Sequence, residues 1–249
     1  IMRVTTFLQV AMFLLAGCAA SLSHGDLATD SIHATAIVID THVDIPPNYA
    51  TAKVDPGLLG NMQVDLPKMV SGGVDVAFFI VYVKQGERSE AGYAEARQAA
   101  IAKFEAIHRQ SEIHGERIEL AQTAADVERI LAEGKLVAMI GVENSFPIGT
   151  NLSLIKDFYT RGARYMSLTH AGHNDLADSA NPIGRTLETA TPEHGGLSEL
   201  GRHALLEMNK VGIIVDVSHA SEATTLQTAA LSRAPIIASH SAVEALSPI

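Results

Sequence analysis

Five potential metal ligands end or follow apolar, strand-like runs of this chain. They are His42, Asp44, Glu143, His219 and His240. Imidazoles and carboxylates are the ligands that suit zinc and chemically similar metals. The C-terminal ends of parallel strands are also where α/β barrels carry their reactive groups. The pattern therefore indicates a metal-dependent hydrolase.

The first two ligands share one segment. His42 and Asp44 lie two residues apart on an extended stretch, so their side chains point the same way. Asp40 lies on that side as well and is expected to support them. One strand end could thus offer an imidazole and a carboxylate to a single ion. The alternative is that both side chains only hydrogen-bond to nearby loops.

The other three ligands extend this pattern to a site for two ions. Glu143 follows a run that should be buried, where a carboxylate is costly unless a cation or hydrogen bonds compensate it. His219 and His240 both stand in Ser-His pairs at the ends of consecutive runs, so they should be neighbours. If Glu143 bridges two ions, these lie about 3.5–4 Å apart and turn a bridging water into hydroxide, which attacks a carbonyl carbon. The alternatives are an ion pair for Glu143 and core positions for the two histidines.

A further histidine, His170, ends another strand-like run and is expected at the same end of the sheet. It could donate to a developing oxyanion or fix a substrate, or it could simply pack within a loop. Seven of the eleven histidines, His173 among them, are expected to be structural or at the surface. The sequence contains no glycine-rich phosphate cradle, serine-hydrolase elbow or dinucleotide fingerprint.

Strand-like and helical runs alternate along the chain, which predicts a parallel sheet of the α/β class. Strands are expected at Ala36–Ile39, Val74–Val83, Leu136–Val142, Arg164–Thr169, Gly212–Val217 and Pro235–Ser239. Helices are expected at Glu87–Ile113, Thr123–Glu133, Leu152–Thr160, Ser198–Val211 and Ser221–Ser232. A closed (β/α)8 barrel needs eight strands, so six predict an open sheet or part of a barrel. The metal ligands favour the barrel.

Composition limits the classes of protein that fit. The chain has 249 residues, 47% of them hydrophobic, which is enough for one domain with a sizeable core. The net charge is −10, and no basic block alternates with aromatic residues, so a nucleic-acid partner is not expected. The single cysteine excludes an intrachain disulfide.

The N-terminal residues have the pattern of a secretory signal, because a basic start precedes an apolar stretch too short to span a membrane. The run Leu15-Ala16-Gly17-Cys18 resembles the lipobox of bacterial lipoproteins, which implies lipidation of Cys18. We expect a signal peptide at 1–18, a tether at 19–33 and a barrel domain at 34–249. The protein is then secreted across the inner membrane and lipid-anchored, on the periplasmic or outer-membrane face. The alternative is an ordinary signal peptide with an incidental cysteine.

Several segments resemble the membrane (renal-type) dipeptidases. The matching segments include Asp40–Pro46, Asp65–Met69, Gly141–Asn144, Gly162–His170, Glu207–Gly212, Val215–His219 and Ser239–Ser241. Their order and spacing agree over about residues 36–249. The resemblance implies a (β/α)8 barrel with two zinc ions that hydrolyses dipeptides, often with a D-residue on the C-terminal side. His170 looks like the substrate-binding histidine of that family.

The same resemblance assigns the metal ligands. It implies that His42 and Asp44 hold one ion, that Glu143 bridges, and that His219 and His240 hold the other. These are the residues that the strand-end pattern selects without reference to any family.

The chain also departs from the family. Members continue past the sixth strand with an Arg-Asn segment that grips the substrate carboxylate, and then with two strands, the last bearing an Asp that handles the proton. None of this is present here, so we expect a C-terminally truncated fragment that is inactive or nearly so, with unpaired edges at strands one and six. Glu143-Asn144-Ser145 also replaces a segment richer in glycine, which is expected to alter the loop.

Other functions remain open. A binuclear amidohydrolase acting on another amide, such as an N-acyl amino acid or a β-lactam, would use the same ligands. A non-catalytic barrel lipoprotein would keep the fold for binding and would contain no zinc. A homodimer is also left open.

Overall fold

The computed structural model describes residues 32–182, 191–243 and 245–246. The chain separates into two compact units, Ile1–Ile37 and Val38–Ile249; in the first, residues 32–35 form a short helical stretch. The expected signal peptide and the lipidation site Cys18 lie outside the described residues, so both stay predictions. None of the described helices combines the length and the apolar character that crossing a bilayer requires.

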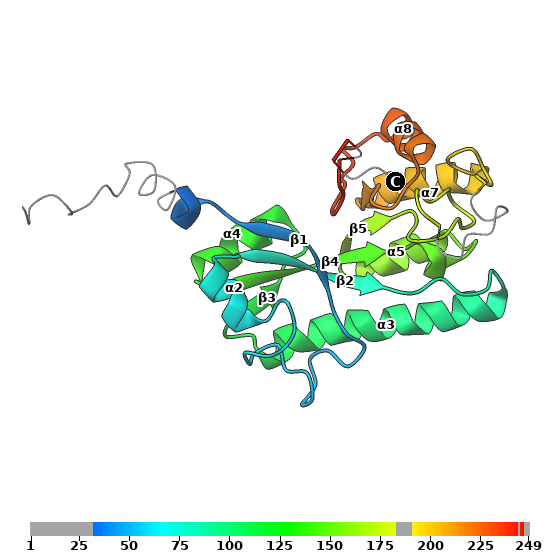
Figure 1. Ribbon diagram of the computed structural model, residues 1–249. Helices are drawn as coiled ribbons and strands as arrows, with labels where there is room; N and C mark the ends of the chain where they lie inside the picture. The colour runs from blue at the N-terminus through cyan, green and yellow to red at the C-terminus, as the bar shows by residue number, and fades with distance from the viewer. Residues whose placement is uncertain (1–31, 183–190, 244, 247–249) are drawn as a thin grey trace, which may run out of the picture. The chain divides into compact units, whose positions relative to one another are not determined.

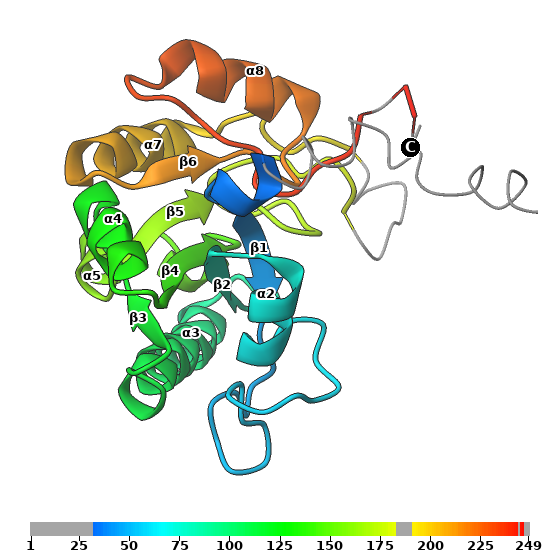
Figure 2. The same ribbon diagram turned by 90° about the vertical axis from the view of Figure 1, so that its left-hand side faces the viewer.

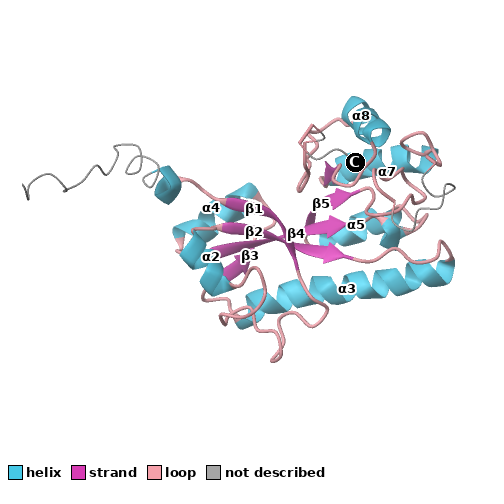
Figure 3. Ribbon diagram, in the orientation of Figure 1, coloured by secondary structure: helices cyan, strands magenta, loops and turns pink. Residues whose placement is uncertain are grey.

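The second unit is built on a parallel sheet, drawn as magenta arrows in Figure 3. Its strands are β1 (Ile39–Asp44), β2 (Val76–Tyr82), β3 (Ile118–Leu120), β4 (Leu136–Glu143), β5 (Ala163–Ser167) and β6 (Ile214–Asp216). The order is β1-β2-β4-β5-β6, and β3 pairs with β4 from outside this path. All of these pairings are parallel, which confirms the predicted α/β class.

Helices return the chain between the strands. They are α2 (Leu66–Gly72), α3 (Glu90–Ile113), α4 (Ala124–Ala132), α5 (Ser153–Thr160), α7 (Glu199–Val211) and α8 (Glu222–Leu231), with a 3-10 turn η1 (Phe146–Ile148). Figure 1 shows the long α3 running alongside the sheet, and Figure 2 shows α3, α5, α7 and α8 outside the curve that the strands follow. The helices therefore cover the outer side of the curved sheet (Figure 2).

The helix starts agree with the sequence because local side chains determine them. Ser89, Ser198 and Ser221 each accept a hydrogen bond from a backbone N–H of the first helical turn. Thr123 forms a reciprocal capping box with Asp126, as its spacing predicts. These caps satisfy donors that the start of a helix leaves without an intrahelical partner. All five predicted helices are confirmed to within a few residues, whereas the seven-residue α2 was not predicted.

The first strand was predicted too early. The apolar run suggested Ala36–Ile39, but β1 begins at Ile39 and ends at Asp44. Backbone pairing with β2 continues through polar residues as far as the pair Asp44 and Ile80. His42 and Asp44 therefore lie within the strand, not after it.

The prediction of a sixth strand at Pro235–Ser239 was also wrong. Within the described residues, Pro235–Ser239 contributes only an isolated parallel bridge between Ile237 and Asp216. In its place, the six-stranded sheet includes β3. This strand is only three residues long, which is too short to show an alternation of apolar and polar residues in the sequence. The path of the sheet nevertheless continues from β6 to Ile237, where the sixth strand was expected.

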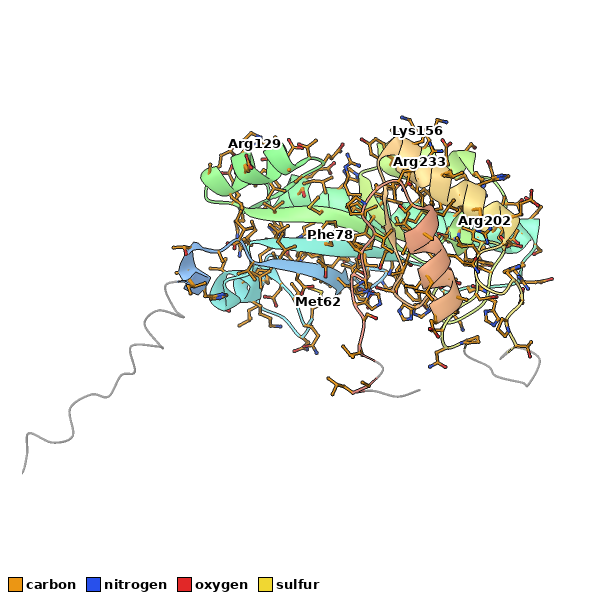
Figure 4. All side chains as sticks on the ribbon, turned by 90° about the horizontal axis from the view of Figure 1, so that it is seen from above. Met62, Phe78, Arg129, Lys156, Arg202 and Arg233 are labelled. Atoms are coloured by element: carbon orange, nitrogen blue, oxygen red, sulfur yellow. The ribbon has the colours of Figure 1, made fainter. Side chains whose placement is uncertain are left out.

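Gly141 makes room for an aromatic ring inside the curve of the sheet. A Cβ on Gly141 in β4 would lie 2.2 Å from the ring of Tyr165, its partner in β5. Phe78 of β2, labelled in Figure 4, packs near the same ring, with centroids 5.1 Å apart. Charged residues such as Arg129 and Lys156 lie on the helices instead (Figure 4). The missing side chain at Gly141 lets Tyr165 reach across toward β1.

We expect Gly141→Ala to destabilise the fold by about 1–3 kcal/mol, the usual cost of an overpacked core. Gly72→Ala is a matched control, because Gly72 ends α2 and an added Cβ meets nothing within 4 Å. That control should be neutral or should stabilise by up to about 1 kcal/mol. Urea unfolding measures both changes, and equal stabilities for the two variants would contradict the assigned role of Gly141.

Candidate metal centre

Glu143, the last residue of β4, is a buried carboxylate surrounded by imidazoles. Its side chain is 4% exposed, and Oε2 lies 3.6 Å from Nε2 of His42. Oε1 lies 3.0, 3.3 and 3.6 Å from the Nε2 atoms of His219, His240 and His170. Four histidines from separate parts of the chain thus converge on one carboxylate.

The topology explains this convergence. Parallel strands deliver their C-terminal ends to one edge of the sheet, toward which the arrowheads of β2, β4 and β5 point in Figure 3. His42 lies near the end of β1, His170 follows β5 and His219 follows β6. His240 follows the bridge at Ile237 that continues the sheet.

The imidazoles also pack against one another. Ring centroids lie 3.8 Å apart for His42 and His240, and 4.4 Å apart for His170 and His219. The Nε2 atoms of His219 and His240 are 2.8 Å apart. Two ring nitrogens approach this closely when one donates its N–H to the lone pair of the other, or when a cation lies between the two lone pairs. The two nitrogens therefore lie close enough to share one cation.

Asp44 stands apart from this cluster. Its Oδ1 lies 3.8 Å from Nε2 of His42, and its side chain is 69% exposed. It belongs to neither of the two close donor groups among the described residues, which are His42, Glu143 and His240, and Glu143, His170 and His219. Asp40 accepts a hydrogen bond from the backbone N–H of His42 at 2.9 Å, which suits a supporting role. Glu143 is the member common to both donor groups.

The electrostatics favour a charged carboxylate at the centre of this cluster. Burial alone raises the pKa of Glu143, but hydrogen bonds with His219 and His240, and the nearby His42 and His170, hold it well below its usual range. Burial lowers the pKa of His42 and of His170. The hydrogen bond with Glu143 raises the pKa of His240. A metal ion needs the anionic carboxylate and the neutral imidazole, so binding would displace protons from this cluster.

Tyr165 supports His42, and sequence reasoning missed it because an aromatic residue in a strand is usually core. Its hydroxyl donates to the carbonyl oxygen of Thr41 at 2.9 Å and lies 3.4 Å from Nδ1 of His42. Because the hydroxyl proton goes to Thr41, Nδ1 of His42 is the donor in the second contact. Nε2 then keeps its lone pair on the side of Glu143.

The residue after Glu143 has an unusual backbone. Asn144 has φ 74, in the left-handed region that glycine adopts readily and asparagine tolerates. Its N–H donates to Oγ of Ser167 at 2.8 Å, and its side chain accepts from the N–H of Phe146 at 3.2 Å. Asn144 thus takes a conformation that a glycine-rich segment would be expected to supply.

Two cavities open beside the cluster. One of about 430 Å³ is lined by His170, Tyr82, Arg88 and Glu193 among others. Arg88 and Glu193 form a two-point ion pair with distances of 2.8 and 3.0 Å. The other, of about 1030 Å³, is lined by Asp44, Tyr82 and residues of α3. Both fall in or near the usual size range of small-molecule sites, about 300–1,000 Å³.

The donor set fits zinc. Imidazole nitrogens and carboxylate oxygens are its common ligands, and a shared carboxylate is a usual arrangement for paired divalent ions. The buried charge of Glu143 favours a cation, and the close Nε2 atoms of His219 and His240 would offer that cation two nitrogen ligands. The residues present therefore match the expected metal chemistry.

Comparisons with known proteins identify similar chains. The family model for membrane dipeptidases (peptidase family M19) matches residues 28–249. Dipeptidase tcpJ of Claviceps purpurea is 36% identical over 190 residues, which is 75% of this chain and 43% of that protein. Dipeptidase 3 of Rattus norvegicus is 30% identical over 184 residues, which is 74% of this chain and 36% of that protein.

Solved structures agree with the expected fold. The probable dipeptidase PvdM from Pseudomonas aeruginosa matches with a TM-score of 0.82 and 29% identity, over 90% of this chain and 56% of that one. A dipeptidase of family M19 matches with a TM-score of 0.72 and 26% identity, over 86% and 65% of the two chains. These dipeptidases are (β/α)8 barrels, so the match confirms the predicted fold class. The chain spans about half the length of the relatives it matches.

Proposed function

The chain belongs to the membrane dipeptidase family, peptidase family M19, and on that premise we propose that its protein is a zinc-dependent dipeptidase. The observation that carries the proposal is the convergence of four imidazoles on the single buried carboxylate of Glu143. Such a site is built to hold cations, because a buried anion is stable only when opposite charge or hydrogen bonds compensate it.

In this proposal His42 and Asp44 hold one zinc ion, His219 and His240 hold a second, and Glu143 lies between them. Bound zinc would supply Lewis acidity and lower the pKa of a water at the centre. The low pKa of Glu143 keeps its carboxylate ionised, so it offers negative charge to both ions across the neutral pH range.

The surrounding side chains would place the substrate. His170 lines the 430 Å³ cavity and is available to donate a hydrogen bond to the carbonyl oxygen of a bound amide. Asp44 lines the second cavity, and Tyr82 lines both. One cavity thus reaches the cluster at His170 and the other at Asp44, which suits a small molecule with a side chain on each side of one amide. We therefore propose a dipeptide substrate, including dipeptides with a C-terminal D-residue.

A substrate panel tests this function. The full-length protein, loaded with zinc, should hydrolyse an L-Ala-D-Ala type dipeptide faster than an N-acyl amino acid or a β-lactam, measured as release of the free amino acid or ring-opened product. Faster turnover of either other amide would favour the general amidohydrolase. A zinc-loaded protein that hydrolyses none of the three would contradict an enzymatic role.

Placement in the cell is part of the proposal and rests on the sequence alone. We propose lipidation of Cys18, anchorage outside the inner membrane and assembly as a homodimer. Membrane fractionation of the wild type and of Cys18→Ser tests the anchor: the variant should leave the membrane fraction. Retention of the variant in that fraction would contradict it.

A further inference from the structure

We propose that Asp216 is a positioning residue that orients His219 and His240 for one of the two metal ions through the hydroxyls of Ser218 and Ser239. The inference rests on the proposed function. It explains a repeated feature of the sequence, because both histidines directly follow a serine. Asp216 itself was not among the predicted site residues.

Asp216, the last residue of β6, is a fully buried carboxylate that accepts four hydrogen bonds. Its Oδ1 accepts from the backbone N–H of Ser218 at 2.9 Å, from the hydroxyl of Ser218 at 2.8 Å and from the backbone N–H of Ser239 at 3.1 Å. Its Oδ2 accepts from the hydroxyl of Ser239 at 2.6 Å. One buried anion thus anchors both Ser-His pairs by main chain and side chain.

The sheet places the two pairs side by side. Ile237 bridges Asp216, its N–H donates to the carbonyl oxygen of Val215, and its carbonyl oxygen accepts from the N–H of Val217. Continuing each segment in parallel brings the two serine hydroxyls to 3.3 Å from one another. The histidines that follow then reach Glu143 from adjacent positions.

The hydrogen bonds determine which nitrogen of His240 carries a proton. Both serine hydroxyls donate to Asp216, so their oxygens act as acceptors toward other groups. Oγ of Ser218 accepts from the backbone N–H of His240 at 3.1 Å, and Oγ of Ser239 lies 3.0 Å from its Nδ1. Nδ1 therefore carries a proton. Nε2 is the nitrogen that faces Glu143 and His219, and a metal ion bound there would displace the proton of its hydrogen bond with Glu143.

Removing this support should weaken the binding of one of the two metal ions and leave the binding of the other unchanged. Ser239→Ala deletes the acceptor for Nδ1 of His240, and Asp216→Asn removes the charge and one of the two acceptor oxygens. Loss of such supporting contacts typically costs about 10–100-fold in metal affinity. His42, which the proposed function assigns to the other ion, is instead contacted by Tyr165 and Asp40. The two binding steps should therefore separate in the variants.

The test is a zinc titration of the full-length protein against a chromophoric chelator. Wild type should bind two equivalents, whereas Ser239→Ala and Asp216→Asn should bind the first normally and the second about 10–100-fold more weakly. Ser239→Thr keeps a hydroxyl and should restore the second step. Ser198→Ala is the matched control, because its hydroxyl caps α7 and donates to the carbonyl oxygen of Asp175, away from the cluster. It should bind both equivalents as the wild type does.

The outcomes separate this inference from the proposed function. Two unchanged binding steps in Ser239→Ala, or equal weakening of both steps, would overturn the positioning role while leaving a zinc enzyme possible. A wild type that binds no zinc would overturn the proposed function itself, and the inference with it. A folded Ser239→Thr with the second step still lost would also contradict the role of the hydroxyl.

Discussion

Glu143→Gln should reduce dipeptide hydrolysis at least about 1,000-fold, since paired metal ions supply several kcal/mol of transition-state stabilisation. Glutamine has nearly the same shape but no charge, so it cannot bridge two cations as an anion. The fold should persist, because the four imidazoles around this position can be neutral once the carboxylate is gone. The measurement is kcat/KM on one dipeptide, with folding checked by circular dichroism.

Glu128→Gln is the control for this substitution. Glu128 is exposed on α4, far from the strand ends that carry the cluster, so the same chemical change should leave kcat/KM at the wild-type value. If Glu143→Gln retained wild-type turnover in folded protein, the assignment of Glu143 to the centre would be wrong.

Zinc removal should give the second large effect. A ligand that binds only the folded state stabilises it by about 4 kcal/mol when its free concentration is about a thousand times Kd. A strong chelator should therefore lower the melting temperature of the wild type by more than about 5 °C. The melting temperature of Glu143→Gln should hardly respond to the chelator, because that variant holds little zinc to remove.

Thermal unfolding with and without chelator measures this effect, and added zinc should reverse it in the wild type. Calcium at the same concentration is the control ion, since it prefers oxygen ligands and this cluster is rich in imidazoles. A wild-type melting temperature that ignores chelator and zinc alike would contradict a metal-stabilised centre.

The sequence was sufficient to predict five of the helices and most of the residues that lie together in the cluster. Helix starts are set by neighbouring residues, as at Thr123 and Ser198, so a short window contains the signal. The ends of apolar runs identify strand ends, and parallel topology brings those ends to one edge. That is why the sequence alone predicts that Glu143, His219 and His240 lie together.

The supporting contacts could not be predicted because they join residues far apart in the chain. Tyr165 contacts His42 across 123 positions, and it can do so only because Gly141 lacks a side chain. Nothing in the pattern of apolar and polar residues along β5 distinguishes this tyrosine from a core residue. Asp216 offered a weak signal, an acidic residue inside an apolar run, but its partners are visible only in the fold.

The predicted bounds of the first strand were wrong for a related reason, whereas those of β2, β4, β5 and β6 agree to within about two residues. An apolar run in the sequence indicates which residues are buried, whereas a strand is defined by its backbone pairing. The backbone of β1 continues to pair with β2 at the polar residues Asp40 and Asp44. The exposed position of Asp44 follows from that geometry and was likewise hidden from the sequence. Its role as a ligand stays a prediction, while the four histidines and Glu143 already lie together.

The central claim is that Glu143 and the histidines around it form a centre for two zinc ions. The most direct measurement is the zinc content of the full-length protein at equilibrium with buffered zinc, by mass spectrometry of the metal, beside that of Glu143→Gln. We predict about two zinc ions per chain for the wild type and fewer than one for the variant. No bound zinc in the wild type, or the same zinc content in both proteins, would contradict the claim.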